Sequence, residues 1–242
     1  MTPAPRPRRL DLGGQVAWMT EPVAEPAGSV VIVHGIGENR TGNNYLLRAL
    51  AEGCAAVGLT AFRFDLPGHG ENTATGGHPE ASALVRAVAA AAGDLVPDRP
   101  VHWTARGLSA AFLPAGDRPA GAGLRVAIAP PDPVALRPSL DGAPALLTPT
   151  EPLAPEENEF WTAVGAEPHL VGGLSVPAAL VHALTVDLEH RPWDVAVAPP
   201  GTPASVTGPS VLVSGADPLL RSEFDRAAVS VLVPRLLREG QR

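Results

Sequence analysis

Ser29-Val-Val-Ile-Val-His-Gly-Ile-Gly-Glu-Asn-Arg40 passes from a near-continuous β-branched run into a polar turn that contains two glycines. Such a run is typical of a strand buried on both faces of a parallel sheet. Leu59-Thr-Ala-Phe-Arg-Phe-Asp-Leu-Pro-Gly-His-Gly-Glu-Asn72 repeats the succession, and leucines at helical spacing between residues 44 and 57 predict a helix that joins the two strands. Both turns therefore belong to the carboxyl edge of one sheet, where such sheets bind ligands.

Helix and strand alternate along the rest of the chain, which predicts an α/β fold with a mostly parallel central sheet flanked by helices. Further strands are expected at residues 15–20, 101–105, 124–129, 193–198 and 210–214. Helices are expected at residues 78–95, 108–113, 176–188 and 222–238, the last of them kinked at Pro234.

A single domain is expected over residues 10–242, because a chain of 242 residues with 45% hydrophobic content can bury a sizeable core. Residues 1–9 are rich in proline and arginine and are predicted to form a disordered arm. From about residue 130 to residue 175 prolines interrupt the pattern, so a short irregular cap, or excursion over the ligand edge, is expected there.

The two turns together, Val33-His-Gly-Ile-Gly-Glu-Asn-Arg40 and Phe64-Asp-Leu-Pro-Gly-His-Gly-Glu-Asn72, resemble the α/β-hydrolase superfamily of serine hydrolases, esterases and thioesterases. The resemblance implies the α/β-hydrolase fold and a triad whose serine attacks an acyl carbon from a strained turn between a strand and a helix. It also implies an oxyanion hole built from two backbone amides. In this chain those donors would be Ile36 and Leu108.

Pro100-Val-His-Trp-Thr-Ala-Arg-Gly-Leu-Ser-Ala-Ala-Phe-Leu113 resembles the strand, turn and helix that carry the nucleophile in that superfamily, and the match places Gly107 at the nucleophile position. Glycine has no side chain that could attack an acyl carbon, so the nucleophile elbow is degenerate. Ala105 and Ser109 stand where the family has its outer glycines. The tight turn accepts these small residues, and glycine lowers the backbone cost at the strained position.

The acid and the histidine of the triad are also missing from their usual places. If residues 193–198 and 210–214 are the last two strands, the acid position falls in Ala198-Pro-Pro-Gly-Thr-Pro-Ala204, which has no carboxylate, and no histidine follows His190. In the alternative alignment, Asp217 is the acid and the final strand and histidine are lacking. We prefer the first alignment, because residues 222–238 have the length of the closing helix.

A shifted register would make Ser109 the nucleophile of an active esterase or thioesterase. The shift moves the hydroxyl two residues into the helix, about 200° around the helix axis from the elbow position. Its partners would have to come from Asp187, His182 and His190. Asp187 and His190 are too close in sequence to occupy the two separate loops that the family uses.

The polar residues at the predicted edge have structural interpretations as well. His34 and Gly35 belong to the first turn, where a histidine usually bonds to backbone. Arg106 precedes the elbow and could bind a carboxylate or phosphate through two N–H groups. A salt bridge from Arg106 to Asp65 or Glu38 is the structural alternative.

The formal net charge is -7, and all 18 basic residues are arginine. This balance gives no reason to expect a nucleic-acid partner, and the absence of lysine excludes Schiff-base chemistry and a Ser-Lys dyad. A single cysteine, Cys54, excludes an intrachain disulfide, and the scattered histidines match no metal pattern.

Gly35-Ile-Gly-Glu lacks the later glycine of a dinucleotide fingerprint, so no cofactor is expected. No apolar run is long enough to span a membrane, and a cytoplasmic location is expected.

The sequence therefore predicts an α/β-hydrolase-like pseudoenzyme without the usual triad. It would bind an acyl or carbonyl group of a small molecule or of a ligand on an acyl carrier, in a biosynthetic tailoring role. An active enzyme that uses Ser109, and a protein-interaction module, are the alternatives, and self-association to a homo-oligomer is left open. The degenerate elbow and Gly172-Gly-Leu-Ser-Val-Pro-Ala-Ala-Leu180 also resemble hydrolase-like proteins that accompany exopolysaccharide export systems.

Overall fold

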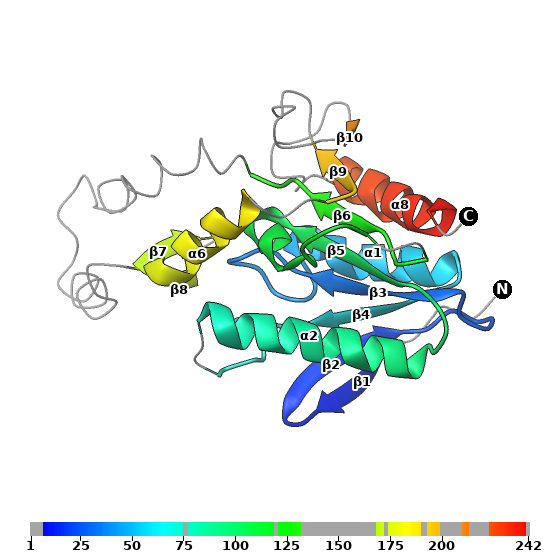
Figure 1. Ribbon diagram of the computed structural model, residues 1–242, viewed down its shortest axis with the longest axis horizontal. Helices are drawn as coiled ribbons and strands as arrows, with labels where there is room; N and C mark the ends of the chain where they lie inside the picture. The colour runs from blue at the N-terminus through cyan, green and yellow to red at the C-terminus, as the bar shows by residue number, and fades with distance from the viewer. Residues whose placement is uncertain are drawn as a thin grey trace.

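The protein is built around an eight-stranded sheet with the order β1-β2-β4-β3-β5-β6-β9-β10 (Figure 1). The computed structural model describes residues 7–74, 77–118, 121–131, 168–171, 174–189, 193–198, 210–212 and 223–240. The pairings of β1 with β2 and of β2 with β4 are antiparallel, and all the others in this sheet are parallel. The strands are β1 Pro7–Leu12, β2 Gln15–Thr20, β3 Gly28–Val33, β4 Leu59–Phe64, β5 Val101–Arg106, β6 Arg125–Ile128, β9 Val195–Ala198 and β10 Ser210–Leu212.

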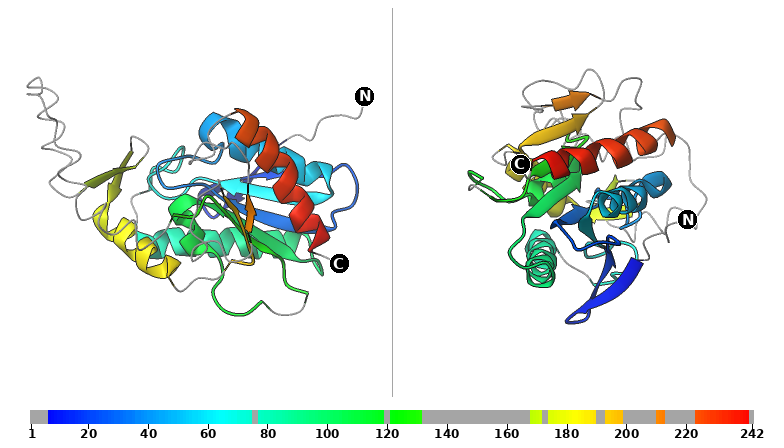
Figure 2. Two further views of the ribbon diagram at one scale, coloured as in Figure 1. Left: turned by 90° about the horizontal axis from the view of Figure 1, so that it is seen from above. Right: turned by 90° about the vertical axis from the view of Figure 1, so that its right-hand side faces the viewer.

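Helices cover both faces of the sheet, as the two views of Figure 2 show. On one face, α1 (Leu46–Ala56) packs against α8 (Glu223–Glu239). On the other face lie α2 (His78–Leu95) and α6 (Ala178–Leu188), together with the short 3-10 helix η2 (Gly107–Phe112). A second 3-10 helix, η1 (Asn43–Tyr45), precedes α1, and a hairpin of β7 (Pro168–Val171) and β8 (Leu174–Pro177) precedes α6.

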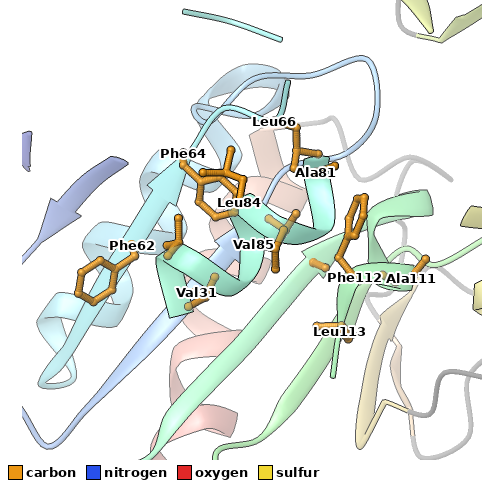
Figure 3. Packing of buried hydrophobic residues seen from close by; sticks show 14 of the residues in the cluster. Val31, Phe62, Phe64, Leu66, Ala81, Leu84, Val85, Ala111, Phe112 and Leu113 are labelled. Atoms are coloured by element: carbon orange, nitrogen blue, oxygen red, sulfur yellow. The ribbon is translucent and has the colours of Figure 1, made fainter. Parts of the chain in front are cut away.

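Each face of the sheet has its own apolar core. All six residues of β3 and all six of β4 are buried, as expected for central strands covered on both faces. Figure 3 shows Leu84 and Val85 of α2 between Phe64 of β4 and Phe112 of η2. On the opposite face, Cys54 lies in the core between α1 and α8, and burial raises the pKa of its thiol.

The strands and helices that the sequence predicts are present within a few residues of the expected bounds. Two expectations need correction. Pro7–Leu12 forms β1 and pairs with β2, so Pro7, Arg8 and Arg9 belong to the sheet and not to a disordered arm. The β7–β8 hairpin stands in the stretch expected to be an irregular excursion, whose residues 132–167 lie outside the described residues.

The carboxyl-terminal part agrees with the preferred alignment. β9 and β10 are adjacent parallel strands at the end of the sheet, and α8 follows them along the chain. Pro234 lies inside α8. The segments that follow β9 and β10, including Asp217, lie outside the described residues. Among the helices that are described, none is long and apolar enough to cross a membrane.

Candidate functional site

The candidate site lies at the carboxyl ends of β3, β4 and β5. β3 is paired with both β4 and β5, and Val33 at its end is in register with Ala105. The loop after β3 starts at His34, the loop after β4 starts at Asp65, and η2 follows β5 directly. The register therefore places the three turns that the sequence singled out side by side at one edge.

Gly107, the residue predicted to stand at the nucleophile position, has a left-handed backbone conformation. It opens η2 immediately after β5 with φ +58°, in the left-handed region, where other residues are disfavoured by about 1–2 kcal/mol. A Cβ atom built on Gly107 would meet no atom of the described residues within 4 Å. The turn therefore has the strained backbone that the sequence analysis expects there, and the described residues leave the space in front of Gly107 open.

The backbone amides of Ile36 and Leu108, which are predicted to form the oxyanion hole, differ from neighbouring amides in their hydrogen bonding. Around Ile36, the Gly35 N–H donates to Glu38 Oε2 (3.3 Å), the Gly37 N–H to His69 Nε2 (3.2 Å) and the Glu38 N–H to the Gly35 carbonyl (3.0 Å). Neither the Ile36 N–H nor the Leu108 N–H makes a hydrogen bond within the part of the chain that the structure describes.

Their positions correspond as well. Ile36 follows Val33 by three residues and Leu108 follows Ala105 by three, and Val33 and Ala105 are register partners. Leu108 stands at the start of η2, where an N–H has no carbonyl one turn earlier to bond with. Two available amide donors in matching positions are the arrangement from which an oxyanion hole is built.

His34 and His69 hold the first two turns together. The Leu66 N–H donates to His34 Nε2 (2.9 Å), so Nδ1 carries the proton and donates to the Gly35 carbonyl (2.8 Å). His69 accepts from Gly37 in the same way and bonds through Nδ1 to the carbonyl of Pro67 (2.9 Å). Burial lowers the pKa of His34 to about 4, so its ring stays neutral near neutral pH. His34 is therefore a structural link between two loops, as its structural interpretation predicted.

Asp65 organises the loop after β4. Its carboxylate pairs with the Arg40 guanidinium and accepts the N–H groups of Arg40 (2.7 Å) and Glu71 (3.0 Å). Arg40 also pairs with Glu71 at 2.9 Å and lies over the Trp18 ring at 5.3 Å. Because these groups occupy its oxygen atoms, the Asp65 carboxylate has a structural role: it holds the loop in place.

Arg106 and Glu38 form a buried ion pair next to the elbow. Their side chains are 6% and 8% exposed, and Glu38 also accepts the Gly35 N–H. Of the two salt bridges considered for Arg106, the one to Glu38 is present, and Asp65 pairs with Arg40 instead. The pair joins the loop after β3 to the end of β5, so it fixes the spacing of the two loops that carry Ile36 and Leu108.

Ser109 is enclosed within η2. Its side chain is fully buried, and its Oγ has no hydrogen-bond partner among the residues that the structure describes. A nucleophilic serine needs a base within hydrogen-bond reach and a path for the substrate. Asp187 lies in α6 but pairs with His78, a residue that the analysis of the sequence did not consider. The side chain of His182 and all of His190 lie outside what the structure describes.

The remaining described histidines lie elsewhere. His102 is buried in β5, and its Nδ1 accepts a hydrogen bond from the Leu124 N–H (2.9 Å). Burial, and to a smaller extent the positive charge of Arg118, lowers the pKa of His102 to about 4. His78 opens α2, 2.9 Å from Asp187, with its ring stacked on Phe112. No sequence pattern predicts that His78 and Asp187 meet, because the two residues are far apart along the chain. Within the described residues, no group of three or more metal-ligating side chains is found.

Comparison with known proteins gives likeness in structure only. No protein-family model matches the sequence, and no curated protein sequence matches it. A carboxyl esterase from Bacillus coagulans in complex with glycerol superposes with a TM-score of 0.64 and 14% identity, covering 100% of both chains. A monoglyceride lipase from Saccharomyces cerevisiae gives 0.60 and 13%, covering 99% of this chain and 96% of the lipase. The thioesterase domain from the curacin biosynthetic pathway gives 0.53 and 17%, covering 96% and 100% respectively. With the strand order, the elbow turn and these likenesses together, the chain is shown to have the α/β-hydrolase fold.

Proposed function

We propose that this protein binds the carbonyl group of an acyl ligand at the Gly107 edge without hydrolysing it. The observation that carries the proposal is Gly107 itself, which has a left-handed backbone, no side-chain nucleophile and, among the described residues, open space in front of it. The available amides of Ile36 and Leu108 support it, since two N–H donors suit a carbonyl oxygen.

In the proposed complex, the carbonyl oxygen accepts hydrogen bonds from Ile36 and Leu108. The acyl carbon then faces Gly107, where a working hydrolase would present a nucleophile. With no nucleophile and with His34 neutral and engaged at both nitrogens, the acyl bond stays intact. The ion pair of Glu38 and Arg106 keeps the two amide-bearing loops at a fixed spacing, which is what binding by preorganised donors requires.

The ligand class follows from the same donors. Esterases, a lipase and a thioesterase share this fold, which favours an ester or thioester of a small molecule or of an acyl carrier. Retention of the acyl bond is consistent with a tailoring or positioning role in a biosynthetic pathway. A cytoplasmic location and self-association stay expectations that the geometry does not address.

The test compares wild type, Gly107→Ser and Gly107→Ala on short and medium p-nitrophenyl esters and acyl thioesters, with labelling by a fluorophosphonate probe. We expect ester binding, detected by ligand-observed NMR, without hydrolysis or labelling of the wild type. Gly107→Ala, which adds a methyl group at the mouth, should weaken binding. Rapid ester hydrolysis by the wild type would refute the proposal.

Ser109 is the alternative nucleophile. The observation that supports this alternative is its Oγ, which has no hydrogen-bond partner among the described residues. Its complete burial requires η2 to move before a substrate can reach it. If Ser109 acts, activity and probe labelling must both disappear in Ser109→Ala. A protein-interaction role would instead leave ester binding absent in every variant and give a complex with a second protein that Gly107→Ser disturbs.

A further inference from the structure

A groove of about 330 Å³ runs between α2 and the segment that follows η2, away from the Gly107 edge. η2 has six residues, and the chain becomes extended at Leu113. Among the described residues, the groove lies between one face of α2 and the residues at the end of η2 and just after it. The lining residues are Ser82, Val85, Arg86, Ala89, Trp103, Phe112 and Pro114.

Both walls of the groove are fixed. The α2 wall presents Ser82, Val85, Arg86 and Ala89, whose spacing of three, four and seven residues places them on one helix face. The opposite wall is tied down by Arg125, which donates to the carbonyls of Pro114 (2.9 Å) and Gly116 (2.6 Å) and pairs with Asp194 at 3.0 Å. A groove with anchored walls can receive a ligand without first being ordered.

A polar pair, His78 and Asp187, lies next to one lining residue of the groove, Phe112. His78 lies one helical turn before Ser82 on the same face of α2, 2.9 Å from Asp187 of α6. Its ring stacks on Phe112 with centroids 5.6 Å apart, and Phe112 also lines the groove. One lining ring of the groove therefore packs on an imidazole that is itself paired with a carboxylate.

The chemistry of the lining is amphipathic. Trp103 and Phe112 supply aromatic surface, and Val85, Ala89 and Pro114 supply aliphatic surface. Arg86 is exposed at the rim, and no described carboxylate pairs with it. An apolar groove with one uncompensated cation complements a molecule with an apolar body and one anionic end.

We propose that this groove is a second ligand site, separate from the Gly107 edge, which takes a small amphipathic carboxylate with an acyl or single-ring body. The body lies between Ala89 and the rings of Trp103 and Phe112, and the carboxylate pairs with Arg86. The proposal shares no residue with the proposed carbonyl site, so either can fail while the other holds.

The test measures the binding of octanoate to the intact protein by titration calorimetry, with acetate as a carboxylate that lacks the body. Ala89→Phe fills the groove, and Ala90→Phe places the same ring on the adjacent exposed position of α2. We expect octanoate to bind and acetate not to bind. Ala89→Phe should weaken octanoate binding at least tenfold, and Ala90→Phe should leave it within twofold of the wild type.

A second pair of variants tests the charge. Arg86→Gln should weaken octanoate binding about two- to fivefold, as for an exposed ion pair. Arg48→Gln, on α1 at the opposite face of the sheet, should leave it unchanged. If Ala89→Phe does not fold, Ser82→Leu on the same wall replaces it.

Three outcomes would overturn the proposal. The first is that octanoate does not bind at millimolar concentrations. The second is that Ala89→Phe binds it as the wild type does, which would place the ligand elsewhere. The third is that Gly107→Ser abolishes octanoate binding while Ala89→Phe does not, which would assign the ligand to the elbow edge and leave the groove empty.

Discussion

The turns after β3, β4 and β5 meet at one edge of the sheet. The polar groups of the first two turns form many hydrogen bonds and ion pairs with one another, whereas, among the described residues, those of the third form few. Around Asp65, His34 and His69, nearly every donor has a partner, from the Arg40 ion pair to the Leu66 N–H. At the turn after β5, no described atom lies in front of Gly107, and the Leu108 N–H has no partner among the described residues. The interactions that hold these loops in place are therefore distinct from the groups assigned to the proposed carbonyl site.

The largest expected effect comes from breaking the engaged region. Asp65→Ala leaves the mostly buried Arg40 guanidinium without its carboxylate and two backbone N–H groups without an acceptor. We expect a loss of about 3–5 kcal/mol in the free energy of unfolding, as for removal of one partner of a buried pair. Urea denaturation followed by circular dichroism measures it. A loss below about 1 kcal/mol would show that Asp65 does not organise this edge.

The second prediction concerns acid. His34 stays neutral in the folded protein down to a pKa of about 4, whereas an unfolded histidine titrates near 6.5. The unfolded chain therefore takes up the proton first, so stability is complete above about pH 6.5 and falls as the pH drops toward 4. The loss is about 3 kcal/mol from His34, and buried His102 adds to it in the same direction.

The measurement is the free energy of unfolding as a function of pH for the wild type and His34→Gln. The glutamine amide offers a donor and an acceptor but does not titrate, so the slope between pH 6.5 and 4 should be shallower in the variant. Equal slopes in the two proteins would mean that His34 is not the group that titrates.

The third prediction sharpens the comparison with two glycines of nearly equal backbone. Gly70 has φ +53° and Gly107 has φ +58°, but a Cβ at Gly70 would lie 2.4 Å from the Asp65 carboxyl group, while one at Gly107 meets no described atom within 4 Å. Gly107→Ala should cost about 1–2 kcal/mol for the backbone alone. Gly70→Ala should cost about 1–3 kcal/mol more, because Asp65 must move. Equal losses would mean that the two loops are equally free to adjust.

The smallest effect is expected away from both regions. Arg48 and Glu52 form an exposed pair one turn apart on α1, with N···O 2.9 Å. Glu52→Gln should change the free energy of unfolding by about 0.5 kcal/mol or less. Thermal melts at low and high salt measure it. A loss comparable with that of Asp65→Ala would undermine the distinction between buried and exposed pairs on which the first prediction rests.

The regular elements could be predicted because their patterns are local. The β-branched run at Ser29–His34 and the alanine-rich stretch at His78–Leu95 each contain enough periodic residues to decide strand or helix. β1 was not predicted because its first three residues, a proline and the charged Arg8 and Arg9, are exposed and show no apolar alternation. Only their pairing with β2 makes them a strand. The β7–β8 hairpin was not predicted because each of its strands has only four residues, too few to show an alternating apolar pattern.

The sequence by itself determined the α/β architecture and the left-handed turn at Gly107, because these depend on residue identity and local periodicity. The loss of a nucleophile at that turn stays a prediction from residue identity. The partners of the polar groups were decided only by the tertiary structure. Arg106 pairs with Glu38 and not Asp65, Ser109 is buried, and His78 meets Asp187 across two helices. Such contacts join residues far apart along the chain, and the packing of helices on the sheet, not any local pattern, sets the distances between them.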